Sequence, residues 1–121
     1  MASVRMNDTH GAPSPEGSFM NCPLYKQHPE LRLSGKLALP DAEPFVHCRG
    51  LNYAFDEVRE YFVRLICELV EDYDIDGIEL DFTRHLPIFE MPVTQRQIDL
   101  ITDWIGEIRA LAHRRKRLLG V

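Results

Sequence analysis

Apolar and polar residues alternate between positions 76 and 83 in the way that is typical of a β-strand. Three apolar side chains alternate there with three polar ones, in the order Ile78, Glu79, Leu80, Asp81, Phe82 and Thr83. Such a strand has one apolar face, and its opposite face carries two carboxylates. The pattern therefore predicts a strand that packs on helices through its apolar face.

Two stretches with a helical period, residues 51–74 and 94–116, flank this strand. In both, apolar residues recur at intervals of three and four, which predicts an amphipathic helix with one face packed on a sheet. Thr94 and Gln97 form the sequence signature of a capping box at the start of the second helix. Trp104 lies on the apolar stripe of that helix, so we expect it in the core.

The remaining elements are a strand near each end of the chain and a long irregular connection. Residues 1–10 contain a short strand followed by polar residues, and residues 117–121 are the apolar start of a further strand. Glycine, proline and serine punctuate residues 11–50, which predicts a long βα loop, with a helical turn or two at 23–30. The order strand, loop, helix, strand, helix, strand is typical of a parallel sheet covered by helices.

This order of elements indicates the α/β class. We expect one partial domain over residues 1–121, equivalent to about half of a (β/α)8 TIM barrel, because a closed barrel needs roughly 250 residues and the chain has 121. In a barrel, Glu79 and Asp81 would point inward, near the carboxyl ends of the strands, where barrel enzymes have their active sites. A partial barrel would also have open strand edges, through which we expect self-association.

Composition and charge narrow the possible partners. The formal net charge of −5 argues against a general nucleic-acid binder, because attraction to phosphates needs a positive surface. The sequence has no apolar run long enough to span a membrane and no visible signal peptide, so a cytoplasmic location is the default expectation. Three cysteines without Cys-x-x-Cys spacing, interpreted as free thiols, are Cys22, Cys48 and Cys67.

The polar residues expected at the carboxyl ends of the strands are candidates for chemistry. Asp81 is the candidate catalytic carboxylate, and Glu79, one layer deeper, is the second. Residues two apart on a strand are separated by about 6.5–7 Å, and glycosidases hold their two carboxyl groups roughly 5–9.5 Å apart. Side chains predicted to bind a hydroxyl-rich substrate at this mouth are Asn7, Asp8, His10, Arg84 and His85, and those predicted to stack on a sugar ring are Tyr25, Tyr53, Phe82 and Phe89.

The same residues also allow structural interpretations. Glu79 would form a buried ion pair with Arg5 if the first strand is its neighbour, because a buried charge needs a partner. Asp81 would then be a hydrogen-bond acceptor at the end of its strand. The basic run 113–117 is typical of a helix C-terminus, where cations complement the helix dipole, although such runs also occur in nucleic-acid-binding proteins.

Two further functional hypotheses remain open. In the first, the protein is a metal-dependent TIM-barrel hydrolase or isomerase with carboxylate and imidazole ligands. The ligands would be Asp8, His10, Glu79, Asp81 and His85. In the second, the chain is a non-catalytic truncated or mispredicted fragment of a larger enzyme.

Several segments resemble a bacterial family of glycoside hydrolase-like TIM-barrel proteins. They are residues 5–8 with His10, 28–32, 51–54, 57–61 and 73–82. In that family a run similar to Pro-Glu-Val-Arg-Glu-Tyr starts a helix, and Tyr-Asp-Val-Asp-Gly-Ile leads into an acidic strand; this chain has Phe55-Asp56 where the family has a proline-containing start. The resemblance implies a TIM barrel that hydrolyses O-glycosyl bonds of a carbohydrate by carboxylate acid/base chemistry. The chain would be the middle portion of such a barrel, and we expect no cofactor and no metal.

Overall fold

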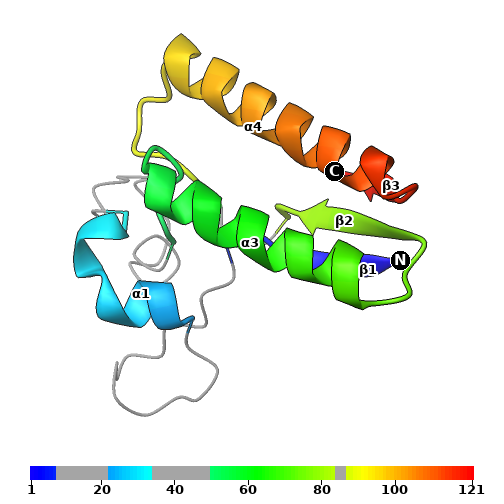
Figure 1. The fold of residues 1–121 in the computed structure, drawn as a ribbon. Helices are drawn as coiled ribbons and strands as arrows, with labels where there is room; N and C mark the ends of the chain where they lie inside the picture. Colours follow the sequence, from blue (N-terminus) through cyan, green and yellow to red (C-terminus); the bar gives the residue numbers. More distant parts are fainter. Residues whose placement is uncertain (8–21, 34–49, 84–86) are drawn as a thin grey trace.

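The computed structural model describes the chain in four stretches: residues 1–7, 22–33, 50–83 and 87–121. A parallel three-stranded sheet lies at the centre of these residues, with strand order β1-β2-β3 (Figure 1). The strands are β1 (Ala2–Arg5), β2 (Gly77–Asp81) and β3 (Leu118–Gly120). The predicted α/β class with a parallel sheet is confirmed.

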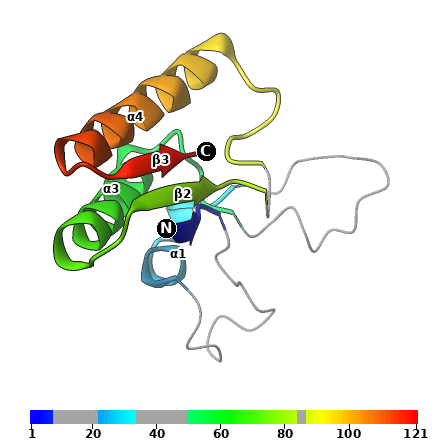
Figure 2. The ribbon, with the colours of Figure 1, turned by 90° about the vertical axis from the view of Figure 1, so that its right-hand side faces the viewer.

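Two long helices cover one face of the sheet (Figure 2). Helix α3 (Asp56–Asp72) precedes β2, and helix α4 (Gln95–Arg114) connects β2 to β3. The apolar side chains of the strands face these helices, because Val4, Ile78 and Leu80 are buried. The helix residues buried against them are Val58, Phe62, Ile66, Val70, Trp104, Ile108 and Ala112, so the prediction of Trp104 as a core residue is confirmed.

Sequence features fix where α4 starts and stops. The predicted capping box forms, since the Gln97 backbone N–H donates to Thr94 Oγ1 at 3.3 Å and the Thr94 N–H donates to Gln97 Oε1 at 2.8 Å. At the other end Lys116 adopts a left-handed conformation with φ 58°. The N–H groups of Lys116 and Arg117 return to the carbonyls of His113 and Ala112, both at 2.9 Å. This is a Schellman arrangement, which satisfies carbonyls that the helix end leaves open.

The basic run after α4 contacts the end of α3. The Arg115 guanidinium lies 2.6 Å from the Glu71 carboxylate, and that of Arg117 lies 3.8 Å from Asp74. These pairs connect the C-terminal ends of the two helices across the amino edge of the sheet. Two residues of the run therefore form ion pairs at the end of α4, while the helix-dipole interpretation stays a prediction.

A short helical unit precedes α3 in the chain. It consists of α1 (Pro23–Gln27) and a 3-10 turn, η1 (Pro29–Leu31), in the region where helical turns were expected. The Arg32 guanidinium donates to the Tyr25 carbonyl at 2.9 Å and 2.6 Å and lies 4.3 Å above the Tyr25 ring. A bridge from Arg32 to Leu51 then joins this unit to the approach to α3. Helix α3 begins at Asp56, although its predicted stretch starts at residue 51.

The sheet is open in the described residues, and closure into a barrel is not seen. Three strands cannot close, because barrel closure requires a complete ring with a matching stagger. The side chains of Ser3, Arg5 and Glu79 are exposed on the face away from the helices, and Asp81 is half-buried. The two carboxylates thus point away from the helices as expected, but Glu79 lies in solvent. No helix among the described residues has the length and apolar character to cross a bilayer.

Candidate functional site

The carboxyl edge of the sheet brings the end of β1 next to the end of β2. Ser3 is in register with Glu79, and Arg5 is in register with Asp81. The pairing continues one step further, since the Met6 N–H donates to the Asp81 carbonyl at 3.0 Å. The sequence interpretation paired Arg5 with Glu79. In the structure Arg5 is in register with Asp81 instead, which is two residues further along the strand.

Asp81 ends the central strand and shapes the turn that follows it. Its Oδ1 accepts a hydrogen bond from the Thr83 backbone N–H at 2.9 Å and a second from the Thr83 hydroxyl. This is an Asx-type turn, in which a short carboxylate side chain holds the backbone two residues on. The carboxylate is therefore held in one orientation at the strand end.

Glu79 lies on the same face as Asp81, one layer nearer the amino end of the strand. Its neighbours in register are Ser3 on β1 and Gly120 on β3. Both neighbours are small, and the Glu79 side chain is exposed. The distance between the two carboxylate positions along the strand, about 6.5–7 Å, remains compatible with a pair that acts on one bond.

Asn7 is buried directly beneath this edge, with 1% of its surface exposed. Its Oδ1 accepts from the Leu51 backbone N–H, and its Nδ2 donates to the Pro87 carbonyl, both at 2.9 Å. The side chain thereby joins the end of β1, the approach to α3 and the loop after β2. Gly50 makes room for it, because a Cβ there would lie 2.5 Å from Asn7 Nδ2. A substrate contact by Asn7 stays a prediction.

Tyr53 is the residue whose role sequence reasoning missed. Its side chain is fully buried, and its hydroxyl donates to the Met6 carbonyl. The ring stacks on Phe62 with centroids 5.4 Å apart and meets Trp104 edge-on at 5.6 Å. Burial raises the pKa of this phenol well above its usual value of 10. The prediction that Tyr53 stacks on a sugar ring is wrong, because the ring is inside the core.

The other aromatic candidates differ in exposure. Phe89 is buried in the same core as Tyr53, so it too is unable to stack on a sugar. Tyr25 and Phe82 are half-buried, and one face of the Tyr25 ring carries the Arg32 guanidinium. A buried tyrosine needs a partner for its hydroxyl, and the sequence gives no local signal for a partner 47 residues away.

Four of the predicted site residues, Asp8, His10, Arg84 and His85, lie outside the described residues. Their proximity to Asp81 therefore stays a prediction. Within the stretches that are described, three or more His, Cys, Asp or Glu side chains nowhere gather as metal ligands would. The hypothetical metal site includes Asp8, His10 and His85, so it stays untested.

Cys22 and Cys67 are free, half-buried thiols, whereas Cys48 lies outside the described residues. Cys22 precedes α1 and contacts Tyr61 on α3. Burial, followed by a hydrogen bond with the Cys22 side chain, raises the pKa of Tyr61 to about 12. This contact attaches the short helical unit to the outer side of α3.

Comparison of the chain with protein-family models and with curated proteins finds no match. The resemblance to glycoside hydrolase-like TIM-barrel proteins therefore stays a prediction. What the described residues establish is a small α/β fold with an open parallel sheet of three strands.

Proposed function

We propose that this chain supplies part of the active site of a glycoside hydrolase-like protein, in which Asp81 acts on a glycosidic bond of a carbohydrate. The observation that carries the proposal is the position of Asp81 at the carboxyl end of the central strand of a parallel sheet. In α/β folds this is the edge at which catalytic residues gather. Carboxylates are the groups with which most glycosidases act.

The surroundings of Asp81 support a role for its carboxyl group. Arg5 is in register with it on the neighbouring strand, and the two hydrogen bonds from Thr83 hold its side chain in place. In the proposal Asp81 is one of the two carboxyl groups that act on the glycosidic bond.

Glu79 is the second carboxylate of the proposal. It lies on the same face of β2, one layer from Asp81, and it is exposed. We propose that it acts with Asp81 on the substrate. The predicted substrate contacts from Asn7, Asp8, His10, Arg84 and His85 belong to this proposal as well.

The test is turnover of a panel of aryl glycosides and natural oligosaccharides by the glycoside hydrolase-like protein to which this chain contributes, and by its Asp81→Asn variant. We expect Asp81→Asn to lower kcat by about 10²–10⁴-fold, the usual contribution of a catalytic acid or base. Thermal unfolding should be nearly unchanged, because the amide oxygen of asparagine still accepts both hydrogen bonds from Thr83. Asp72→Asn, at an exposed position at the end of α3, is the matched control. Turnover retained in Asp81→Asn would remove Asp81 from the mechanism.

We also propose that the chain self-associates through its strand edges. In the described residues β1 and β3 each have a strand neighbour on one side only, and Leu118 on β3 is 68% exposed. Unpaired edges of this kind are templates for pairing with another chain. Sedimentation velocity should show association that Leu118→Lys reduces, and a concentration-independent monomer would contradict the proposal.

A further inference from the structure

Tyr53 lies where three segments at the carboxyl edge of the sheet meet. Its hydroxyl donates to the carbonyl of Met6, directly after β1. Its ring meets the ring of Phe82, directly after β2, edge-on with centroids 6.2 Å apart. Its backbone N–H donates at 2.9 Å to the carbonyl of Ile88, which belongs to the segment that follows β2 in the chain. One buried residue therefore connects the ends of β1 and β2 with that segment.

Met6 transmits the contact of the Tyr53 hydroxyl to Asp81. The carbonyl of Met6 accepts from Tyr53, while its N–H donates to the backbone carbonyl of Asp81 at 3.0 Å. The Met6 side chain is itself fully buried. Arg5, the residue before Met6, is in register with Asp81. The Tyr53 hydroxyl therefore holds β1 against the residue that carries the candidate carboxylate.

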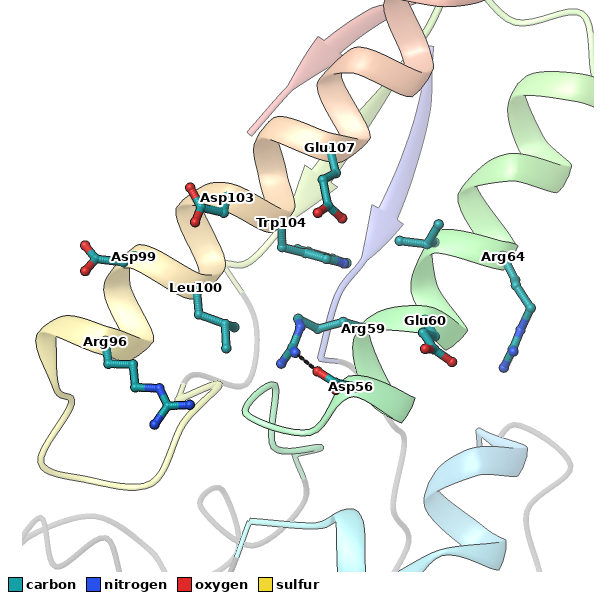
Figure 3. Close-up of a pocket in the computed structure, with 11 residues that line it drawn as sticks. Asp56, Arg59, Glu60, Arg64, Arg96, Asp99, Leu100, Asp103, Trp104 and Glu107 are labelled. Atoms are coloured by element: carbon teal, nitrogen blue, oxygen red, sulfur yellow. Dashed lines mark hydrogen bonds and ion pairs between the residues drawn. The ribbon is translucent and has the colours of Figure 1, made fainter.

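The surroundings of Tyr53 leave it little room to move. Its ring stacks on Phe62 and meets Trp104 edge-on, with centroids 5.4 Å and 5.6 Å apart. Arg59 donates to its backbone carbonyl and pairs with Asp56 at the start of α3. Figure 3 shows Arg59 and Trp104 entering the space between α3 and α4 from opposite helices. Burial raises the pKa of the Tyr53 phenol well above its usual value of 10, so the hydroxyl stays a donor at neutral pH.

We propose that Tyr53 is a positioning residue for Asp81, an inference that rests on the proposed glycosidase function. The side chain of Tyr53 is fully buried, so it acts without touching the substrate. It acts through Met6, which holds the backbone of Asp81, and through Phe82, the residue that follows Asp81. A misplacement of about 1 Å at a reacting group can cost about 10²-fold in rate. A residue that fixes the strand end beneath a catalytic carboxyl group thus contributes to the rate.

The first test is turnover of an aryl glycoside by the glycoside hydrolase-like protein to which this chain contributes. Tyr53→Phe keeps the buried ring and removes only the hydroxyl. We expect kcat to fall about ten- to a hundredfold with KM nearly unchanged, because the change acts on the reacting group and not on substrate binding. Tyr61→Phe is the matched control, since it removes a phenol hydroxyl that bonds Cys22 and not a strand end, and it should turn over as the parent does. All variants are assayed well below their unfolding temperatures.

A second measurement needs no activity and uses the full chain. Amide exchange at Met6 reports on its hydrogen bond to the Asp81 backbone, and the amide resonance of Thr83 reports on its hydrogen bond to the Asp81 carboxylate. In Tyr53→Phe, exchange at Met6 should accelerate about tenfold and the Thr83 resonance should shift. Exchange at Ile108, inside α4, should stay close to that of the parent. A tyrosine that only stabilised the core would accelerate exchange at Met6 and Ile108 alike.

The outcomes separate this inference from the function on which it rests. Turnover retained in Asp81→Asn overturns the proposed function and the inference with it. Turnover lost in Asp81→Asn but parental in Tyr53→Phe overturns the inference alone, and so does equal acceleration of exchange at Met6 and Ile108.

Phe82→Leu tests the second contact if Tyr53→Phe does not fold. It removes the ring that meets Tyr53 and keeps an apolar side chain. We expect kcat to fall about tenfold with KM nearly unchanged. A parental kcat overturns the inference, and so does a change confined to KM, which is the result that stacking of Phe82 on a sugar would produce.

Discussion

The two faces of the parallel sheet differ in what covers them. On one face Val4, Ile78 and Leu80 are buried under α3 and α4, while on the other Ser3 and Glu79 are exposed. Both faces come from the same alternating stretches of sequence, so the side chains that each strand directs to its two sides decide which face packs against the helices. The apolar face stabilises the fold through its buried contacts, whereas the exposed polar face is accessible to a ligand.

The largest difference in stability between the two faces is expected from alanine substitutions at two neighbouring residues of β2. Leu80→Ala should lower the free energy of unfolding by about 3–5 kcal/mol, because it removes fully buried methyl groups and leaves a cavity. Glu79→Ala, on the exposed face, should change it by no more than about 0.5 kcal/mol. Urea denaturation of both variants measures the contrast. Similar losses in the two would mean that Glu79 has a buried partner.

Asn7→Ala should have the next largest effect. The change leaves the Leu51 N–H and the Pro87 carbonyl buried without their partner, which costs about 2–4 kcal/mol for the two groups. Amide exchange at Leu51 should accelerate in the variant more than exchange in α4, which identifies the loss as local. A stability equal to that of the parent would show that this edge is held by other contacts.

The stability of the fold should depend on pH through Tyr61 on α3. Because burial and the Cys22 hydrogen bond raise the pKa of this phenol from 10 to about 12, its contribution to stability is complete below pH 10. That contribution falls as the pH rises from 10 toward 12. Denaturation midpoints across this window should drop less in Tyr61→Phe than in the parent. If the midpoint fell equally with pH in the two proteins, Tyr61 would be excluded as the source of the pH effect.

The smallest expected effect is a gain in stability. Lys116 holds a left-handed conformation that costs a lysine more than a glycine. Lys116→Gly should therefore raise the free energy of unfolding by about 0.5–1 kcal/mol, without change at either face of the sheet. Lys116→Ala keeps the side-chain penalty and serves as the control. A destabilised glycine variant would mean that the lysine side chain itself contributes.

Local patterns in the sequence were sufficient for the elements and the direction of their faces. The two-residue period of residues 76–83 predicted which side of β2 meets the helices, and Thr94 with Gln97 predicted the start of α4. Each of these depends on residues a few positions apart. The open sheet was beyond such reasoning, because what lies across from Glu79 depends on strands that local patterns do not specify.

The candidate site was predicted less completely, for the same physical reason. Asp81 was identified from its place at a strand end, and its turn with Thr83 is a local interaction. Asn7 was predicted as a substrate contact, yet its hydrogen-bond partners are 44 and 80 residues away in the chain. Tyr53 likewise reaches Met6 over 47 residues. Long-range polar contacts leave no periodic signal, so only the folded chain reveals which side chains support the site.

The ion pair between Arg115 and Glu71 joins the C-terminal ends of α4 and α3. Both side chains are about half exposed, so dissolved salt screens the attraction between them. Added salt would therefore loosen the contact between the two helix ends, while it leaves the apolar packing between the helices in place.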